Sequence, residues 1–263
     1  DPYKLEDYLK DIAEIKGEEC FNTKTNRRIK AVVPMHTFGH PVDLDPLMEV
    51  CQKYKLELVE DAAESLGSYY KGKHTGTFGK ASSLSFNGNK IMTTGGGGAI
   101  LTDDDHLADL AKHLTTTAKK PHLWEYMHDE IGYNFRMPNI NAALGCAQLE
   151  KVPDFLRRKR VVAKRYIKAF ENVSGVEIKE EQPFSKSNYW LNTLILDKKH
   201  ASCRDDLLKG LNDAGIMARP IWMPMHRLPM YRDFPKMDVS ISEQLVTRVI
   251  NLPSSARIGG QYE

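Results

Sequence analysis

The feature that most constrains the fold is an alternation of short apolar runs and amphipathic segments over the first two thirds of the chain. The spacing of apolar residues predicts helices at 45–54 and 104–114, the second with acidic residues in its first turn, where the helix dipole favours them. Extended runs predict strands at 31–35, 56–60, 82–86 and 99–102. Strands and helices that alternate in this way are typical of an α/β fold with a mostly parallel sheet.

The pattern changes near residue 138. A long helical stretch follows over 139–170, and after it come short extended runs and an amphipathic helix at 204–214. The sequence therefore predicts a large α/β domain over 1–138, a connecting long helix over 139–172 and a small C-terminal α+β domain over 173–263.

Charge and cysteine spacing narrow the classes of function. Lys and Arg number 37 against 35 Asp and Glu, so the whole chain presents no electrostatic footprint for nucleic acid. The basic cluster from Lys24 to Lys30 is interpreted as a solvated loop before a strand. No apolar run approaches membrane-spanning length, and no signal peptide is visible. Four cysteines without CxxC or CxxH spacing indicate reduced thiols in a cytoplasmic protein rather than disulfides or a metal site.

Asp61 is the first residue that points to chemistry. It stands at the carboxyl end of the predicted strand 56–60, and ligands of open α/β sheets bind off those ends. A carboxylate there could bind a metal, act as a base or pair with a cationic ring nitrogen. Alone it is a weak signal, because aspartates at strand ends also cap the helix that follows.

A hydroxyl and an amine follow on a later strand and loop. The predicted strand 82–86 delivers Ser85, and Lys90 comes five residues later. Small and apolar neighbours would desolvate the Lys90 amine, lower its pKa and make it a nucleophile, although a single lysine in a turn is more often a surface residue. The glycine run 95–98 fits neither a P-loop nor a dinucleotide-binding pattern, and either packs closely under a cofactor or forms a loose turn.

Together these features are more specific than any one of them. A strand-end carboxylate, a hydroxyl and a lysine on a later strand and loop, and a glycine hinge are what pyridoxal phosphate requires. The lysine would form a Schiff base with it, the carboxylate would keep its ring nitrogen protonated, and the hydroxyl would bind its phosphate. The sequence therefore predicts a pyridoxal phosphate site centred on Lys90.

Five blocks of sequence carry a likeness to known proteins. They are PMHTFGHPVDLDPL from Pro34, VEDAAESLGSYYKGKHTGTFG from Val59, SFNGNKIMTTGGGGAI from Ser85, GYNFRMPNINAALGCAQL from Gly132 and RPIWMPMH from Arg219. In this order they resemble the DegT/DnrJ/EryC1/StrS family of sugar aminotransferases, over essentially the whole chain. The resemblance implies a fold-type I large domain and a small C-terminal α+β domain. The fullest likeness is to members that aminate UDP- or GDP-linked 4-keto-6-deoxy-N-acetylhexosamines for bacillosamine- and legionaminic-acid-type surface sugars.

The resemblance implies a role for each matching position. Lys90 would be the Schiff-base lysine and would shuttle the proton between the amino donor and the sugar. Asp61 would pair with the pyridinium nitrogen, Glu64 would lie beside the 3-oxygen of the ring, and Ser85 would bind the phosphate. Asn134 would reach the cofactor phosphate of a neighbouring subunit, which implies an obligate homodimer with shared active sites.

Three further residues are candidates for contact with the substrate. His36 follows the predicted strand 31–35 at the sheet edge, where it could touch substrate or cofactor or serve a structural role. Arg219 and His226 lie in the last block, which faces the substrate entrance in relatives. Either of them could instead orient the loop.

The activity that the resemblance implies is transfer of the amino group of L-glutamate to the C4 ketone of such a nucleotide sugar. Lys90 argues against the sister branch that carries histidine there and dehydrates the sugar at C3. The alternative is a non-catalytic regulator of the same fold that binds the cofactor or a sugar nucleotide, and the intact set of Asp61, Ser85, Lys90 and Asn134 weighs against it. Family members carry a further amino-terminal segment with cofactor contacts, so we expect this chain to lack part of that pocket.

Overall fold

The computed structural model describes residues 1–260, and the chain divides into two compact units. The first contains Asp1–Asp154 and Phe184–Asn188, and the second contains the remainder. The division therefore falls inside a helix and does not coincide with the predicted boundaries at 138 and 172.

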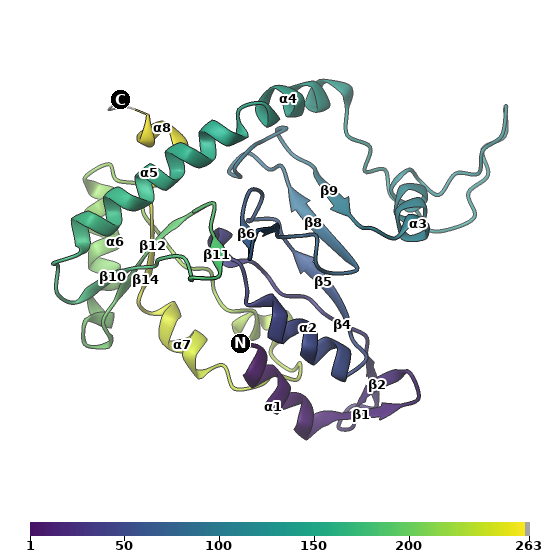
Figure 1. The fold of residues 1–263 in the computed structure, drawn as a ribbon, viewed down its shortest axis with the longest axis horizontal. Helices are drawn as coiled ribbons and strands as arrows, with labels where there is room; N and C mark the ends of the chain where they lie inside the picture. Colours follow the sequence, from purple (N-terminus) through teal and green to yellow (C-terminus); the bar gives the residue numbers. More distant parts are fainter. Residues whose placement is uncertain (261–263) are drawn as a thin grey trace. The chain divides into compact units, whose positions relative to one another are not determined.

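A mixed four-stranded sheet organises the first unit (Figure 1). Its strands lie in the order β4 (Ala31–Val32), β5 (Glu57–Asp61), β8 (Ala81–Ser85) and β9 (Gly98–Leu101). The first three are parallel, and β9 runs antiparallel to β8. The predicted α/β fold is thereby confirmed.

Strand β4 is shorter than the predicted strand 31–35. Pro34 has no N–H to donate to a neighbouring strand, so the regular pairing cannot continue through it. Its carbonyl still accepts a hydrogen bond of 2.9 Å from the N–H of Asp61, and Met35 forms an isolated parallel bridge with the same residue. The chain therefore stays beside the end of β5 although the strand has ended.

The core of the first unit lies between the sheet and two helices, α1 (Pro2–Ile12) and α2 (Leu44–Lys53). The buried residues of α2 recur at helical spacing, which makes one face of that helix apolar. The cluster contains Leu9, Cys20, Leu44, Leu47, Val50, Cys51, Tyr54, Leu56, Leu58 and Tyr70. Full burial of a leucine or valine side chain contributes about 1.5–3 kcal/mol, so this cluster holds the sheet against the helices.

Two smaller antiparallel sheets also belong to the first unit, as does α3 (Asp105–Thr115). One contains β1 (Ala13–Lys16), β2 (Glu19–Asn22) and β3 (Arg27–Ile29). The basic cluster at Lys24–Lys30 is therefore only partly a loop, because Arg28 lies on β3 and pairs with Glu19 at 2.6 Å. The other contains β6 (Tyr69–Tyr70), β7 (Lys73–His74) and β11 (Ser185–Lys186). Strand β11 brings a segment from late in the sequence into the first unit.

The long helix predicted over 139–170 is two helices, α4 (Asn139–Leu149) and α5 (Val152–Phe170). Pro153 explains the interruption, because its nitrogen has no hydrogen to donate and its ring would clash with the carbonyl of Leu149. Within residues 1–260, no helix is both long and apolar enough to cross a membrane.

The second unit is built on an antiparallel sheet in the order β10 (Val176–Ile178), β12 (Asn192–Leu196), β14 (Val249–Leu252) and β13 (Arg219–Pro220). Apolar residues of these strands, such as Leu196 and Ile250, pack with Ile167 of α5 and Leu208 of α6 (Arg204–Asp213). The unit also contains η2 (Lys198–Cys203), η3 (Met225–Arg227), η4 (Pro229–Tyr231), α7 (Ser240–Val246) and α8 (Ala256–Gly259).

Lys159 of α5 is a buried amine in the second unit, with 6% of its surface exposed. It donates hydrogen bonds to the carbonyl of Trp190, at 3.0 Å, and to the carbonyl of Ser254. Burial lowers the pKa of Lys159 to about 8. A neutral amine still has hydrogens for both carbonyls, so α5 remains tied to these two positions when the charge is lost.

Candidate active site

Asp61 and Ser85 lie on the same face of the sheet, where the parallel strands β5 and β8 end. Asp61 is the register partner of Ser83, and Ser85 is two residues further along β8. Side chains alternate along a strand, so the carboxylate of Asp61 and the hydroxyl of Ser85 project to the same side. The N–H of Ala63 donates to Oδ1 of Asp61 at 3.1 Å as the chain leaves β5. Ligands of open α/β sheets bind at such strand ends.

Lys90 lies in the loop that connects β8 and β9. The loop is closed by hydrogen bonds from Phe86 N to Gly97 O at 2.9 Å and from Thr94 N to Phe86 O at 3.0 Å. Lys90 N donates to Asn87 O at 3.0 Å in a turn at the tip. The main-chain positions on both sides of the amine are therefore fixed.

The Lys90 side chain is half-buried and lies within the electrostatic influence of two carboxyl groups. Burial lowers the pKa of Lys90, and the charges of Glu64 and Asp61 act in the opposite direction. The Lys90 amine therefore lies close enough to Asp61 and Glu64 for their charges to act on it. Desolvation favours the neutral amine, which is the form in which a lysine acts as a nucleophile, whereas the two carboxylates favour the charged form.

Glu64 is buried, and its carboxylate is anchored to the main chain. Oε2 of Glu64 accepts a hydrogen bond of 2.7 Å from the N–H of Phe38. Phe38 lies in η1 (Thr37–Gly39) with φ of 58°, a left-handed conformation that is uncommon for a bulky residue. Burial raises the pKa of Glu64, whereas the Phe38 N–H and the charge of Lys90 lower it, and the charge of Asp61 raises it further.

His36 has no exposed surface, and both of its ring nitrogens are engaged. Nδ1 accepts a hydrogen bond of 3.2 Å from Val42 N, so Nε2 carries the proton and donates to Oε2 of Glu60 at 3.0 Å. Of the two roles open to His36 in the sequence, this geometry favours the structural role over contact with a substrate.

Glu60 is a buried carboxylate that the sequence does not single out. It accepts hydrogen bonds from the N–H groups of Gly76, Phe78 and Gly79 at 2.7, 2.7 and 2.9 Å. Burial raises the pKa of Glu60, but the hydrogen bonds from His36 and the three N–H groups outweigh it, so the pKa lies below its ordinary value. Glu60 therefore holds the 76–79 loop from the opposite side of β5 to Asp61.

The glycine run packs closely against β8. Gly98 is the register partner of Ser85, and a Cβ added to Gly98 would lie 2.3 Å from the carbonyl oxygen of Leu84. No real Cβ contact is that short, so only glycine fits beside Ser85 without a shift of the backbone. Gly96, by contrast, has nothing within 4 Å of its added Cβ.

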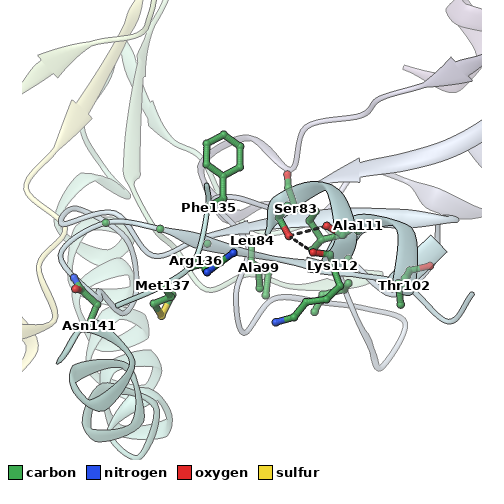
Figure 2. A pocket seen from close by; sticks show the side chains of 18 of the residues that line it. Ser83, Leu84, Ala99, Thr102, Ala111, Lys112, Phe135, Arg136, Met137 and Asn141 are labelled. Atoms are coloured by element: carbon green, nitrogen blue, oxygen red, sulfur yellow. Dashed lines mark hydrogen bonds between the residues drawn. The ribbon is translucent and has the colours of Figure 1, made fainter. Parts of the chain in front are cut away.

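A cavity of about 1040 Å³ lies on the other face of the same strands. Its lining includes residues of β8, β9, α3 and the segment 135–141, and Figure 2 shows Leu84, Ala99 and Met137 on one side of the strands. Leu84 and Ala99 are register partners that alternate with Ser85, so they face away from the Ser85 hydroxyl. Lys90 is not among the residues that line this cavity.

Asn134 is exposed on a segment that pairs with the end of α3. Tyr133 N donates to Leu114 O at 2.7 Å, Phe135 N donates to Thr115 O at 2.9 Å, and Asn134 forms a bridge with Thr116. The Asn134 side chain therefore projects from a fixed stretch of backbone into open surroundings. Its role stays a prediction.

Arg219 and His226 belong to the second unit. Nη1 of Arg219 donates to Oδ1 of Asn212 and to the carbonyl of Ala218, each at 2.9 Å. His226 forms a hydrogen bond with the carboxylate of Glu243 through Nε2. These partners fix the local loops, and the proposed contacts with a substrate stay predictions.

The residues on the Asp61 face fit pyridoxal phosphate in their chemistry. They supply an amine with a lowered pKa, a carboxylate at the end of β5 and a hydroxyl at the end of β8, beside a glycine that admits no side chain. Residues 1–260 contain no group of three His, Cys, Asp or Glu side chains placed to hold a metal ion.

Comparison with known proteins gives a consistent result. Residues 7–261 match the model of the DegT/DnrJ/EryC1/StrS aminotransferase family. GDP-perosamine synthase of Escherichia coli O157:H7 is 40% identical over 231 residues, which cover 88% of this chain and 62% of that protein. EpsN of Bacillus subtilis (strain 168), named as a candidate pyridoxal phosphate-dependent aminotransferase, is 38% identical over 233 residues, which cover 87% of this chain and 59% of that protein.

A solved structure supports the same relationship. PseC of Helicobacter pylori, described as an aminotransferase involved in the biosynthesis of pseudoaminic acid, superposes with a TM-score of 0.82 at 29% identity. The match covers 86% of this chain and 62% of PseC. The chain thus spans less than two thirds of the length of each of these three proteins.

Proposed function

The chain belongs to the DegT/DnrJ/EryC1/StrS aminotransferase family, and on that premise we propose that the protein is a pyridoxal-phosphate-dependent nucleotide-sugar aminotransferase. The observation that carries the proposal is the position of Lys90 in the loop after β8. Its amine is half-buried, and the charges of Asp61, at the end of β5, and Glu64, shortly after it, act on the pKa of that amine. An exposed lysine in an ordinary turn would have neither the desolvation nor the two carboxyl groups.

Each residue of the site has a separate part in the proposed reaction. Pyridoxal phosphate, when bound, supplies the electron sink that allows an amino donor to lose its α proton. Lys90 would hold the cofactor through its Nζ. Its amine would then take the α proton of the donor in the first half of the reaction and deliver a proton to the sugar C4 in the second. Asp61 would keep the ring nitrogen protonated through its carboxylate, and Ser85 would donate its hydroxyl hydrogen to the phosphate. Glu64 would lie beside the ring 3-oxygen.

The proposed substrates are L-glutamate and the C4 ketone of a UDP- or GDP-linked 4-keto-6-deoxy-N-acetylhexosamine. The amino group leaves glutamate as 2-oxoglutarate forms, and the sugar ketone becomes an amine. The names of similar proteins support this class of substrate, since they include GDP-perosamine synthases and UDP-4-amino-4,6-dideoxy-N-acetyl-beta-L-altrosamine transaminase.

The proposed active form is a homodimer in which Asn134 of one subunit reaches the cofactor phosphate of the other. The segment around Asn134 supports this arrangement, because it exposes large apolar side chains that a partner would cover. Among them are Leu123, Trp124, Tyr126, Ile131, Phe135 and Ile140.

The test is a screen of 4-keto nucleotide sugars with glutamate and pyridoxal phosphate, using the full-length protein. We expect one sugar to be aminated with release of 2-oxoglutarate, and borohydride to fix the cofactor to the peptide that contains Lys90. Lys90→Ala should abolish both results. Lys80→Ala is the matched control, because Lys80 forms an exposed ion pair with Glu57 at 2.8 Å outside the site.

The alternative function, a non-catalytic regulator with the same fold, predicts a different outcome. It would bind the cofactor or a sugar nucleotide, and turnover would be missing with every sugar tested. If borohydride fixes no cofactor at Lys90, or if Lys90→Ala turns over like the unmodified protein, the proposed function is wrong.

A further inference from the structure

The Asn188 side chain is fully buried in the first unit, where its amide binds the main chain just after β5. Its Nδ2 donates to the carbonyl oxygen of Glu64 at 2.8 Å and to that of Leu66 at 3.0 Å. Both hydrogens of one amide are therefore used on the short stretch of chain that follows Asp61. These partners are 124 and 122 positions away in the sequence, so the contact is a product of the tertiary fold.

The main chain around Asn188 is fixed in the same place. Its N–H donates to Oγ of Ser68 at 2.9 Å, and Ser68 donates in turn to the carbonyl of Gly39 at 2.7 Å. Ser187 also donates to the Gly39 carbonyl, at 2.9 Å. Just before it, Ser185 and Lys186 form strand β11 and pair with β6. Asn188 is therefore delivered by a segment with little freedom to move.

Glu64 is held at both of its ends. Asn188 binds its carbonyl oxygen, and the N–H of Phe38 binds its carboxylate at 2.7 Å. The Phe38 N–H projects from a turn whose next residue, Gly39, also accepts hydrogen bonds from Ser68 and Ser187. Asn188 and its neighbours thus join the turn that carries Glu64 to the turn that orients its carboxylate.

We propose that Asn188 is a positioning residue that fixes the Glu64 carboxylate beside the amine of Lys90. The proposal rests on the proposed function, in which that amine holds the cofactor. Asn188 touches neither the cofactor nor the substrate in this role, and it acts through Glu64. Loss of the amide would leave the buried carbonyl of Glu64 and the partly buried carbonyl of Leu66 without this donor, and would free the Glu64 turn to relax away from Lys90.

The experiment measures cofactor binding in the full-length protein loaded with pyridoxal phosphate. The readouts are the dissociation constant of the cofactor and the pH midpoint of its visible absorbance band. For Asn188→Ala we expect the dissociation constant to rise by about 10-fold, as for other residues that orient a ligand-binding group. We expect the midpoint to fall, because a negative charge near the amine favours its cationic form and that charge has moved away.

A double-mutant cycle separates positioning from a general loss of structure. Glu64→Gln keeps an oxygen for the Phe38 N–H but removes the charge, so the midpoint should fall by itself. Asn188→Ala added to Glu64→Gln should then cause no further fall. Asn192→Ala is the matched control, because it removes another buried amide, whose Nδ2 donates to Oγ of Ser254 at 3.0 Å in the second unit, and it should leave the midpoint unchanged.

Three results would overturn the proposal: an unchanged midpoint in Asn188→Ala, an equal fall with and without Glu64→Gln, or an equal fall in Asn192→Ala. If Asn188→Ala does not fold, Asn188→Ser takes its place, since serine is too short to reach both carbonyls. The proposed function itself has a separate test in the wild-type protein, which should show a visible cofactor band that disappears on treatment with borohydride. Absence of such a band would contradict the proposed function.

Discussion

Nε2 of His36 lies 3.0 Å from Oε2 of Glu60, and neither side chain has any exposed surface. Glu60 also binds three backbone N–H groups of the 76–79 loop. The residue that follows it, Asp61, projects from the other face of β5 toward the proposed cofactor site. The hydrogen bonds of His36 and Glu60 therefore fix the end of β5 on the face opposite to Asp61, and this holds the Asp61 carboxylate in a constant position.

Glu60→Gln should destabilise the protein strongly. A neutral amide would place an NH2 group against backbone N–H donors, and breaking a buried charged network costs about 3–5 kcal/mol. The measurement is the free energy of unfolding from a urea titration at neutral pH. Glu57→Gln on the same strand is the control, because its exposed ion pair with Lys80 is expected to contribute only about 0–1 kcal/mol. Equal losses in the two variants would contradict the role of Glu60.

Acid should remove the stabilisation that Glu60 provides. Burial raises the pKa of Glu60, but its hydrogen bonds outweigh burial and leave the pKa below the ordinary value of 4.5. A carboxyl group with a depressed folded pKa contributes stability that is present above the unfolded pKa and is lost as pH falls through the folded pKa. The difference in unfolding free energy between wild type and Glu60→Gln should therefore shrink below about pH 4.5. A difference that is constant with pH would exclude this origin.

Gly98→Ala should damage the site without removing any functional group. The new Cβ would meet the Leu84 carbonyl at 2.3 Å, so β9 must shift next to Ser85. Overpacking of this kind costs about 1–3 kcal/mol, and the displaced hydroxyl should bind the cofactor phosphate less tightly. Gly96→Ala is the control, since nothing lies within 4 Å of its added Cβ. Thermal unfolding and cofactor titration measure the two effects.

Lys159 should make the protein more stable as pH rises above neutral. Burial lowers the pKa of Lys159 to about 8 from 10.5, so between these values the unfolded chain binds more protons than the folded chain. Stability then rises with pH across that window, by on the order of 3 kcal/mol in total. Lys159→Met should lose this rise, and Lys164→Met, at an exposed position of the same helix, should keep it. Urea titrations from pH 7 to about pH 10 test the difference.

Asp61→Asn should separate catalysis from folding. The amide can keep the hydrogen bond from Ala63 N but cannot hold a proton on the ring nitrogen. We expect transfer to fall on the order of 100-fold, the usual effect of removing one electrostatic contact from an active site. The unfolding free energy should change little, because the Asp61 side chain is only partly buried. Transfer close to the wild-type rate would contradict the proposed role.

The α/β fold and the residues around Lys90 could be predicted from the sequence because their signals are local. Apolar periodicity marks the helices and strands, and Asp61, Ser85 and Lys90 each stand at or just after the end of a strand. Pro153 marks the break between α4 and α5 in the sequence. Helical spacing of apolar residues continues on both sides of it, and for that reason the pattern predicts one helix instead of two. Lys159 could not be singled out, because it lies in a basic run whose other lysines are exposed.

Asn188 and Glu60 could not be predicted for a different reason. Their roles depend on where distant main-chain groups lie, and no local pattern reports the position of a carbonyl 124 residues away. A buried asparagine and a surface asparagine have the same appearance in the sequence. The same limit applies to His36, whose structural role becomes visible only when both of its hydrogen-bond partners are located.

The segment Phe184–Asn188 gives the two units an interlaced connectivity. Within residues 1–260 the polypeptide crosses between them after residues 154, 183 and 188. A fragment cut at residue 154 would lack β11 and the amide that holds the Glu64 turn, although it would retain Lys90. Neither unit is therefore a separable module that could be exchanged between proteins by a single crossover, and recombination that preserves the lysine site must carry this short downstream segment with it.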